Sequence, residues 1–419
     1  MRVSWANLRS SSAPWLLLPV LVYAALYIDD AVFTEPSGYG VESGELAARA
    51  LVVIAPAVAA AAAWEAGRHR VLRALDSTAL RGPVRRFLRS ASPVLALLLV
   101  LVAASLAIAH HETGVFPGGA AGWLAVAHLL VISLGWLLIG RRLGSVAPAS
   151  VTAPAVALVC WAWLSMPASM DALWVRHMGG YVDRMSTITD LRSPAAYLVP
   201  WGVVAGLVLA CQAATALRPR PLAAVAAVAL VAATLATGRA LVIDWGDTAP
   251  STPRTTALTC VGSAPRVCVP PEYAPHAATI RDEILEPVRR LAAAGIPAPR
   301  ELRLASAERP LAPGTWPLYW SPPPREGRPP SPDQYAADLA ESAVTGTAAT
   351  AGRTDCRRPG STAAAWAALV DGVDARSVQA ALPPPEWEAL QKVRARPAAA
   401  QATWFTDAAV SGRHCRAVS

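Results

Sequence analysis

The cysteines are the residues whose type and spacing most directly suggest chemistry. Four of the six, Cys260, Cys268, Cys356 and Cys415, follow residue 245. An even number of cysteines in one segment predicts two disulfides in an oxidising compartment, with three possible pairings. The favoured pairing closes a short loop between Cys260 and Cys268 and ties the chain end back through Cys356 and Cys415. Metal binding by these four thiols is the alternative, but their spacing lacks the Cys-x-x-Cys pattern of structural zinc sites.

Other polar side chains occur within or beside apolar stretches. His110, His111 and Glu112 are consecutive, so they point in different directions and favour an interfacial polar cap over a metal site. His128 lies in the middle of an apolar stretch, where it could relay protons or simply form a hydrogen bond to a neighbouring helix. Arg239 lies near the end of another stretch, from which its side chain can reach the interface.

The motifs of P-loop nucleotide binding and of the common hydrolases are absent from the sequence. It contains no Gly-x-x-x-x-Gly-Lys-[Ser/Thr] segment for nucleotide phosphates, no His-Glu-x-x-His and no Gly-x-Ser-x-Gly. We therefore expect a protein that is not an enzyme and that needs no cofactor or metal. A membrane-embedded enzyme remains an alternative, with His128 or the His110–Glu112 group as its candidate residues.

The elements that must position the candidate residues within residues 1–245 are helices formed by apolar stretches. Before about residue 245, seven of them reach or approach the roughly 20 residues that cross a hydrocarbon core. This pattern predicts an α-helical membrane domain over residues 1–245. The expected spans are 13–32, 46–66, 93–111, 120–140, 149–169, 195–215 and 222–243.

Flanking charges predict the orientation of these spans, because arginine-rich loops stay in the cytoplasm. The 67–92 loop is the most basic, whereas the 33–45 loop contains glutamates and no basic residue. Alternating crossings then place the N-terminus in the cytoplasm and residues 246–419 outside the plasma membrane. The net charge of +8 reflects arginines at the membrane borders and indicates contact with lipid headgroups rather than nucleic acid. The arginines of the basic loop, which could bind a cytoplasmic partner, are Arg68, Arg70, Arg73, Arg81, Arg85, Arg86 and Arg89.

Residues 246–419 predict a small α+β domain that contains disulfides. Strands are expected at 254–261, 266–269 and 301–305, with an amphipathic helix over 275–294. The proline-rich stretch 308–332 predicts an extended loop without regular structure. Further helices are expected at 332–346, 361–371, 375–382, 385–395 and 399–411.

The opening segment, Trp5-Ala-Asn-Leu-Arg9-Ser-Ser-Ser-Ala-Pro-Trp15, runs directly into the first span. Together with the basic loop after span two, it resembles permease subunits of ABC-2 type exporters. With Cys260, Cys268-Val-Pro-Pro-Glu-Tyr and the helix behind it, the whole chain resembles uncharacterised actinobacterial membrane proteins related to such exporters. The seven expected spans and the external C-terminal domain depart from the usual permease pattern of six spans ending inside.

The resemblance implies a non-enzymatic membrane subunit of an exporter-like system. Such a subunit would need a separate cytoplasmic ATPase, and it could assemble as a homo- or hetero-oligomer in the lipid bilayer. The alternative is a membrane-anchored external domain that binds or scaffolds other molecules and has no transport role.

Overall fold

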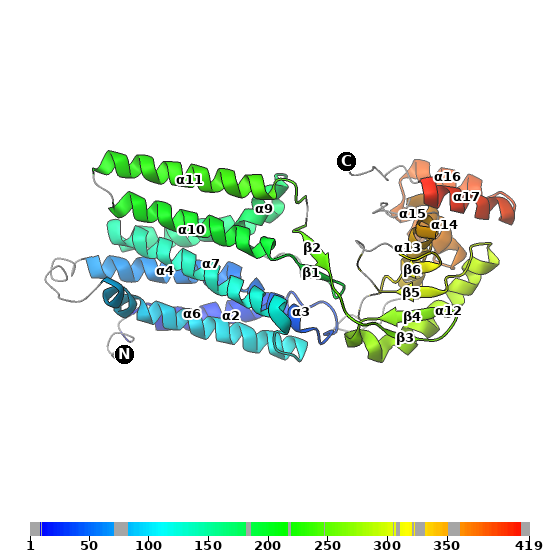
Figure 1. Cartoon of the computed structure of the whole chain (residues 1–419), viewed down its shortest axis with the longest axis horizontal. Coiled ribbons are helices and arrows are strands. Elements are labelled where there is room, and N and C mark those ends of the chain that lie inside the picture. The colour runs from blue at the N-terminus through cyan, green and yellow to red at the C-terminus, as the bar shows by residue number, and fades with distance from the viewer. Residues whose placement is uncertain are drawn as a thin grey trace. The chain divides into compact units, whose positions relative to one another are not determined.

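The computed structural model describes residues 9, 11–70, 83–181, 186–216, 219–246, 248–304, 306, 311–320, 322, 332–350 and 361–411. The chain divides into two compact units. The bundle unit comprises residues 1–32, 38–187 and 191–251, and the C-terminal unit comprises residues 33–37, 188–190 and 252–419. Both are shown in Figure 1.

The bundle unit consists of helices that follow the apolar stretches of the sequence. Six of them, with α8 and η1 counted as one segment, are long and apolar enough to cross a membrane, and α2 is a shorter apolar helix of 17 residues. In Figure 1 the long helices run side by side along the unit. The elements are α2 (Ala13–Asp29), α3 (Gly40–Arg49), α4 (Leu51–Arg70), α6 (Pro83–Thr113), α7 (Gly119–Val146), α8 (Ala149–Ser165), η1 (Met166–Ser169), α9 (Leu173–Gly179), α10 (Ala195–Ala216) and α11 (Arg220–Val242).

The alanine-rich helix α4 lies at the centre of the bundle. It is the most buried of the long helices, and it packs against α7 through very small side chains. A Cβ atom built on Gly140 would lie 2.2 Å from the carbonyl oxygen of Ala59, and one on Gly144 would lie 2.0 Å from that of Ala63. In a lipid bilayer the hydrophobic effect does not drive helices together, so helices associate through close packing. Gly and Ala allow this packing because their small side chains let the two backbones approach closely. The alanines of α4 therefore serve helix packing.

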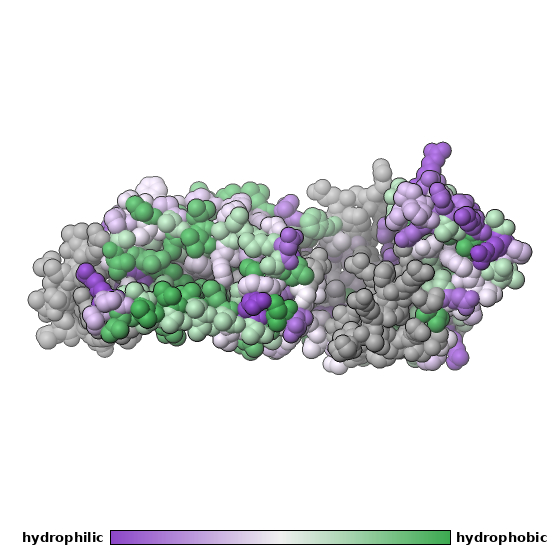
Figure 2. All heavy atoms as spheres, turned by 90° about the horizontal axis from the view of Figure 1, so that it is seen from above, coloured by the Kyte–Doolittle hydropathy of each residue, from purple (hydrophilic) through white to green (hydrophobic). Residues whose placement is uncertain are grey.

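The outer helices carry apolar side chains on their surface. Figure 2 shows hydrophobic residues along the visible face of the bundle and hydrophilic ones toward the helix ends. Large exposed side chains include Leu158 on α8, Leu209 on α10 and Val228 on α11. Of the long helices, α11 is the least buried. Such an apolar surface is suited to contact with the hydrocarbon core of a membrane.

Helix α3 is the main departure from the sequence-based expectation for this unit. Residues 33–45 were expected to form an external loop, but the helix already begins at Gly40 and only Ala50 separates it from α4. The side chain of Glu45 is 0% exposed. The expectation was wrong because Glu42 and Glu45 lower the local hydropathy, although hydrogen bonds satisfy Glu45 inside the bundle.

The C-terminal unit combines a sheet with helices. The strands are β3 (Thr259–Val261), β4 (Arg266–Val269), β5 (Glu301–Arg303) and β6 (Thr315–Pro317). They form one sheet in the order β3-β4-β5-β6, with β3–β4 antiparallel and the other two pairs parallel. A second pair, β1 (Asp190–Arg192) and β2 (Ser251–Pro253), lies where the chain passes between the units. The helices are η2 (Pro271–His276), α12 (Ala277–Ala293), α13 (Pro332–Thr350), α14 (Ser361–Val370), α15 (Ala375–Ala381), α16 (Pro384–Arg394) and α17 (Ala398–Ser411).

One face of the four-stranded sheet packs against the helices. Alternate strand residues, including Val267, Leu302 and Trp316, are buried in one core with Ile280 and Leu291 of α12. Helix α12 and the helices after α13 match their sequence-based expectations closely. Two strand expectations were wrong. The 254–261 strand is confined to β3 at its end, and the proline-rich stretch contains β6, whose Trp316 is anchored in the core.

Candidate functional site: a buried polar network in the bundle

Glu45 is the centre of a hydrogen-bond network that joins α3 to α10 and to the segment before α10. Its Oε1 accepts hydrogen bonds from Ser186 Oγ at 2.7 Å, Tyr197 Oη at 3.1 Å and Arg192 Nε at 3.3 Å. Its Oε2 accepts from the backbone N–H of Ser186. The Arg192 side chain is mostly buried and supplies the counter-charge. A buried carboxylate is tolerated only when it is paired and hydrogen-bonded in this way.

His128 on α7 extends this network. Trp201 Nε1 lies 2.9 Å from His128 Nδ1, and His128 Nε2 lies 2.6 Å from the carbonyl oxygen of Gly180. An indole N–H can only donate, so Nδ1 must accept and Nε2 must carry the hydrogen that it donates to Gly180. The rings of His128 and Tyr197 are in edge contact, with centroids 5.2 Å apart. His128 thus links α7 to α10 and to the residues after α9.

Gly180 is required where it packs on His128. Its φ is +84°, and a Cβ atom there would lie 3.1 Å from His128 Nε2 and 2.9 Å from Pro200 Cβ. A larger residue would be strained by the backbone conformation and would press on the ring. Gly180, which follows α9, and Ser186, which precedes α10, are therefore both held to the bundle by the network.

The network can hold helices together, but its hydrogen-bonding atoms already have partners within the protein. Both nitrogens of His128 and both oxygens of Glu45 have partners, so the geometry favours a hydrogen-bonded histidine over a proton relay. Sequence reasoning singled out His128 but missed Glu45, Tyr197 and Trp201. The available signal was an acidic residue four positions before Arg49 in a stretch that is otherwise rich in small and apolar residues.

A second polar contact ties the other end of the bundle together. Glu65 on α4 is buried and accepts hydrogen bonds from Ser12 N at 2.7 Å and Ser12 Oγ at 3.1 Å, just before α2 begins. Arg68 pairs with the same carboxylate at 3.4 Å. The start of α2 is thereby fastened to the end of α4, next to the basic segment.

The remaining basic residues that the sequence singled out are only partly described. Arg239 is exposed on α11 and its guanidinium carbon lies 5.3 Å from the ring centroid of Trp174 on α9, a cation–π contact. In the basic segment, Arg68 has a described side chain, and two arginines, Arg73 and Arg81, lie outside the described residues. The others are placed in helices by their backbone alone: Arg70 ends α4, and Arg85, Arg86 and Arg89 lie in the first turns of α6.

The cysteines divide as follows. Cys260 and Cys268 form a disulfide between facing residues of β3 and β4. Cys356 and Cys415 lie outside the described residues, so their expected bridge stays a prediction. Cys160 and Cys211 are free thiols in α8 and α10. Among the described residues, no three His, Cys, Asp or Glu side chains come together as metal ligands. His110 instead stacks on Phe116, with centroids 4.1 Å apart.

The C-terminal unit has a cleft of about 360 Å³ on the sheet face that α12 does not cover. Strand alternation places Cys260, Arg303 and Thr315 on this face, and all three line the cleft. Its arginines are paired with carboxylates. Arg254 makes two hydrogen bonds to Glu272, at 2.6 and 3.1 Å. The cleft is therefore polar but largely charge-compensated.

Glu301 joins two arginines on the same face. Its Oε1 accepts from Arg303 Nε at 2.7 Å, and its Oε2 accepts from Arg266 Nε at 3.0 Å. Burial alone would raise the pKa of Glu301, but the hydrogen bonds from Arg266 and Arg303 outweigh it and lower that pKa. The carboxylate thus stays ionised between β4 and β5.

The two units define a class of protein: an apolar helical bundle of membrane-spanning dimensions joined to a two-layer α/β domain with a disulfide. A family model described as a domain of unknown function (DUF7224) matches residues 267–415, which lie in the C-terminal unit. No curated protein and no solved structure matches the chain. The family match does not extend to the bundle unit.

Proposed function

We propose that the chain is a non-enzymatic integral membrane subunit of an exporter-like system that depends on a separate cytoplasmic ATPase. In this proposal α2 is a seventh crossing, the N-terminus is cytoplasmic and the C-terminal unit is extracytoplasmic. The observation that carries it is the basic segment between α4 and α6, together with the Glu65 contacts that fasten its first arginine to α2. A partner bound there would act directly on two membrane helices.

The proposed orientation is supported by where basic residues lie on the helices. Arg68 is near the end of α4, Arg141 and Arg142 are near the end of α7, and Arg220 begins α11. Alternating crossings bring all of these to the same side, which the arginine bias of cytoplasmic loops makes the inside. In intact cells, an impermeant thiol reagent should label Asp171→Cys, an exposed position between η1 and α9, and should not label Ser150→Cys, an exposed position in α8. Labelling of Ser150→Cys alone would overturn the orientation.

The partnership is tested by gentle-detergent purification of the tagged full-length protein from its native membrane. We expect an ATPase with a P-loop to co-purify in stoichiometric amount. Replacing Arg68, Arg70 and Arg73 by Gln should abolish its recovery. The matched control replaces Arg376, Arg394 and Arg396 of the C-terminal unit by Gln and should leave recovery unchanged. An equal loss in both variants, or no ATPase with the wild type, would refute the proposal.

The second candidate is a membrane-anchored extracytoplasmic protein that binds or scaffolds another molecule. The cleft on the helix-free sheet face favours it, because a concave site with mixed polar and apolar lining suits a small ligand. Co-purification of envelope proteins alone, together with loss of phenotype on removing residues 252–419, would favour this function over export.

A further inference from the structure

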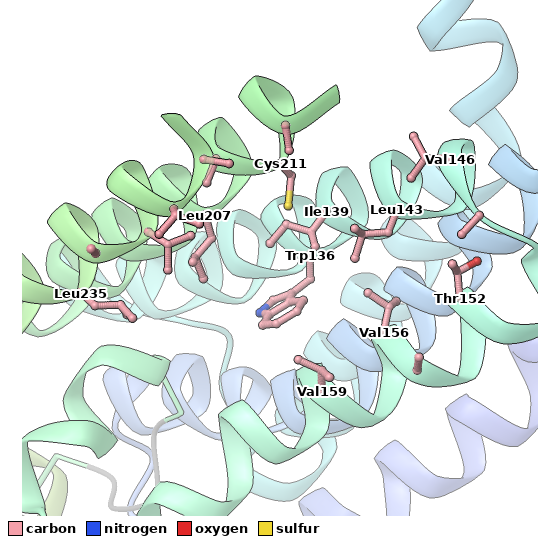
Figure 3. A pocket seen from close by; sticks show the side chains of 18 residues that line it. Trp136, Ile139, Leu143, Val146, Thr152, Val156, Val159, Leu207, Cys211 and Leu235 are labelled. Carbon is pink, nitrogen blue, oxygen red and sulfur yellow. The ribbon is translucent and has the colours of Figure 1, made fainter. Parts of the chain in front are cut away.

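A groove of about 790 Å³ runs between α7, α8, α10 and α11 in the bundle unit (Figure 3). Its walls are hydrocarbon: Trp136 and Leu143 of α7, Val156 of α8, Leu207 of α10 and Leu235 of α11 are typical. Among the described residues that line it, Thr152 has the one hydroxyl, which donates to the Pro148 carbonyl oxygen at 3.0 Å within its own helix. The surface of the groove is therefore almost wholly apolar and suits an apolar occupant.

The groove occupies one half of the span. Its lining on α7 extends from Trp136 to Val146, a rise of ~15 Å at 1.5 Å per residue. A hydrocarbon core is ~30 Å thick, so the groove corresponds to a single leaflet. It lies toward the ends where α7 and α10 finish and α8 begins, because Ala147, Thr152 and Ala214 line it there, and its α11 wall, from Ala227 to Leu235, is the middle of that helix.

Two arginines lie near that end of the groove on the same helices, although neither is a lining residue. Arg220 is seven residues before Ala227, a lining residue of α11, so it lies on nearly the same helix face about 10 Å nearer the helix start. Arg142 directly precedes Leu143, another lining residue. Neither guanidinium has a hydrogen-bond or ion-pair partner among the described residues. Basic side chains near the end of an apolar groove between membrane helices can bind acidic lipid headgroups.

We infer that this groove holds the acyl chains of an anionic phospholipid, whose phosphate is bound at Arg220 and Arg142. A partner transmembrane helix would also cover the apolar walls, but an apolar helix brings no charge for the two arginines. A phospholipid supplies hydrocarbon and negative charge in one molecule, already oriented along the membrane normal. This inference does not depend on the export role.

The test is native mass spectrometry of the full-length protein, released from detergent after incubation with phosphatidylglycerol or phosphatidylcholine. Wild type should retain phosphatidylglycerol in preference to phosphatidylcholine. Arg220→Gln should reduce phosphatidylglycerol retention about fivefold, the effect of one basic residue near an anionic surface, and should leave phosphatidylcholine retention unchanged.

A steric variant tests the groove itself. Both Ala232 and Ala233 are exposed, but only Ala232 lines the groove, and Ala233 lies about 100° further around α11. Ala232→Phe should lower retention of both lipids, and Ala233→Phe, the matched control, should lower neither. Equal effects of the two substitutions, an unchanged lipid preference in Arg220→Gln, or a stoichiometric small membrane protein in place of lipid would each overturn the inference.

Discussion

Asp371 should make the stability of the C-terminal unit depend on pH. It lies in the turn between α14 and α15 and is only 2% exposed. Neither carboxyl oxygen has a hydrogen-bond partner among the described residues. Arg290 donates instead to the backbone carbonyl oxygen of Asp371. Burial raises the pKa of Asp371 to about 8, and the positive charge of Arg290 opposes this rise only in part.

The sign of the effect follows from which state binds the proton. In the folded chain the carboxyl stays protonated up to about pH 8, whereas in the unfolded chain it ionises near pH 4. Its neutral form therefore contributes stability that is complete below about pH 4 and is lost as the pH rises through about 8. At ~1.4 kcal/mol per pH unit, the free energy of unfolding should fall by roughly 4 kcal/mol between pH 5 and pH 8.

The change is Asp371→Asn, which keeps the shape of the side chain and removes its titration. The full-length protein in detergent is unfolded in urea at pH 5, 6, 7 and 8, and the folded fraction is read by pulse proteolysis with a C-terminal tag. Wild type should lose stability across this range, and Asp371→Asn should lose much less and exceed wild type at pH 8. Asp282→Asn, at an exposed carboxylate on α12, is the matched control and should follow wild type.

Parallel pH profiles of wild type and Asp371→Asn would refute this reasoning. They would mean that the carboxyl is already ionised in the folded state at pH 7, held by water or by a movement of Arg290. If the stability of Asp282→Asn also became less dependent on pH, the pH dependence would be assigned to general charge effects.

The remaining predictions concern the polar network and the disulfide. Glu45→Ala leaves the largely buried Arg192 without its counter-charge, so it should destabilise the bundle by about 3–5 kcal/mol, whereas Tyr197→Phe removes one hydrogen bond and should cost about 1 kcal/mol. Thermal unfolding of the detergent-solubilised protein measures both, and similar melting temperatures for the two variants would contradict the central role of Glu45. Gly180→Ala should lower the melting temperature, because it strains a φ of +84° and crowds His128, while Gly202→Ala, where a Cβ atom would meet open space, should not. Cys268→Ser should lower the stability of the C-terminal unit by about 2–3 kcal/mol, the loop-closure term for a short loop, and an unchanged urea midpoint would show that β3 and β4 pair equally well without the bridge.

The sequence by itself determined most of the helices and the Cys260–Cys268 disulfide. Runs of apolar residues define a helix locally, because a lipid-exposed backbone must satisfy its own hydrogen bonds. The stripe of Ile280, Ile284 and Leu291 likewise marks α12, since helical spacing alone brings these residues to one face. The Cys260–Cys268 pair also needed only local information, because the two residues face each other across a short antiparallel turn.

Only the tertiary structure decided the polar network, the role of α4 and the strand in the proline-rich stretch. Tyr197 is 152 residues from Glu45, and no local pattern indicates that the two meet. The alanines of α4 look like a weak span until the glycines of α7 are seen against them. Trp316 becomes a strand residue because β5 offers it a parallel partner. Local sequence determines the helices, whereas the short strands, the buried polar pairs and the close backbone contacts depend on which distant elements pack together.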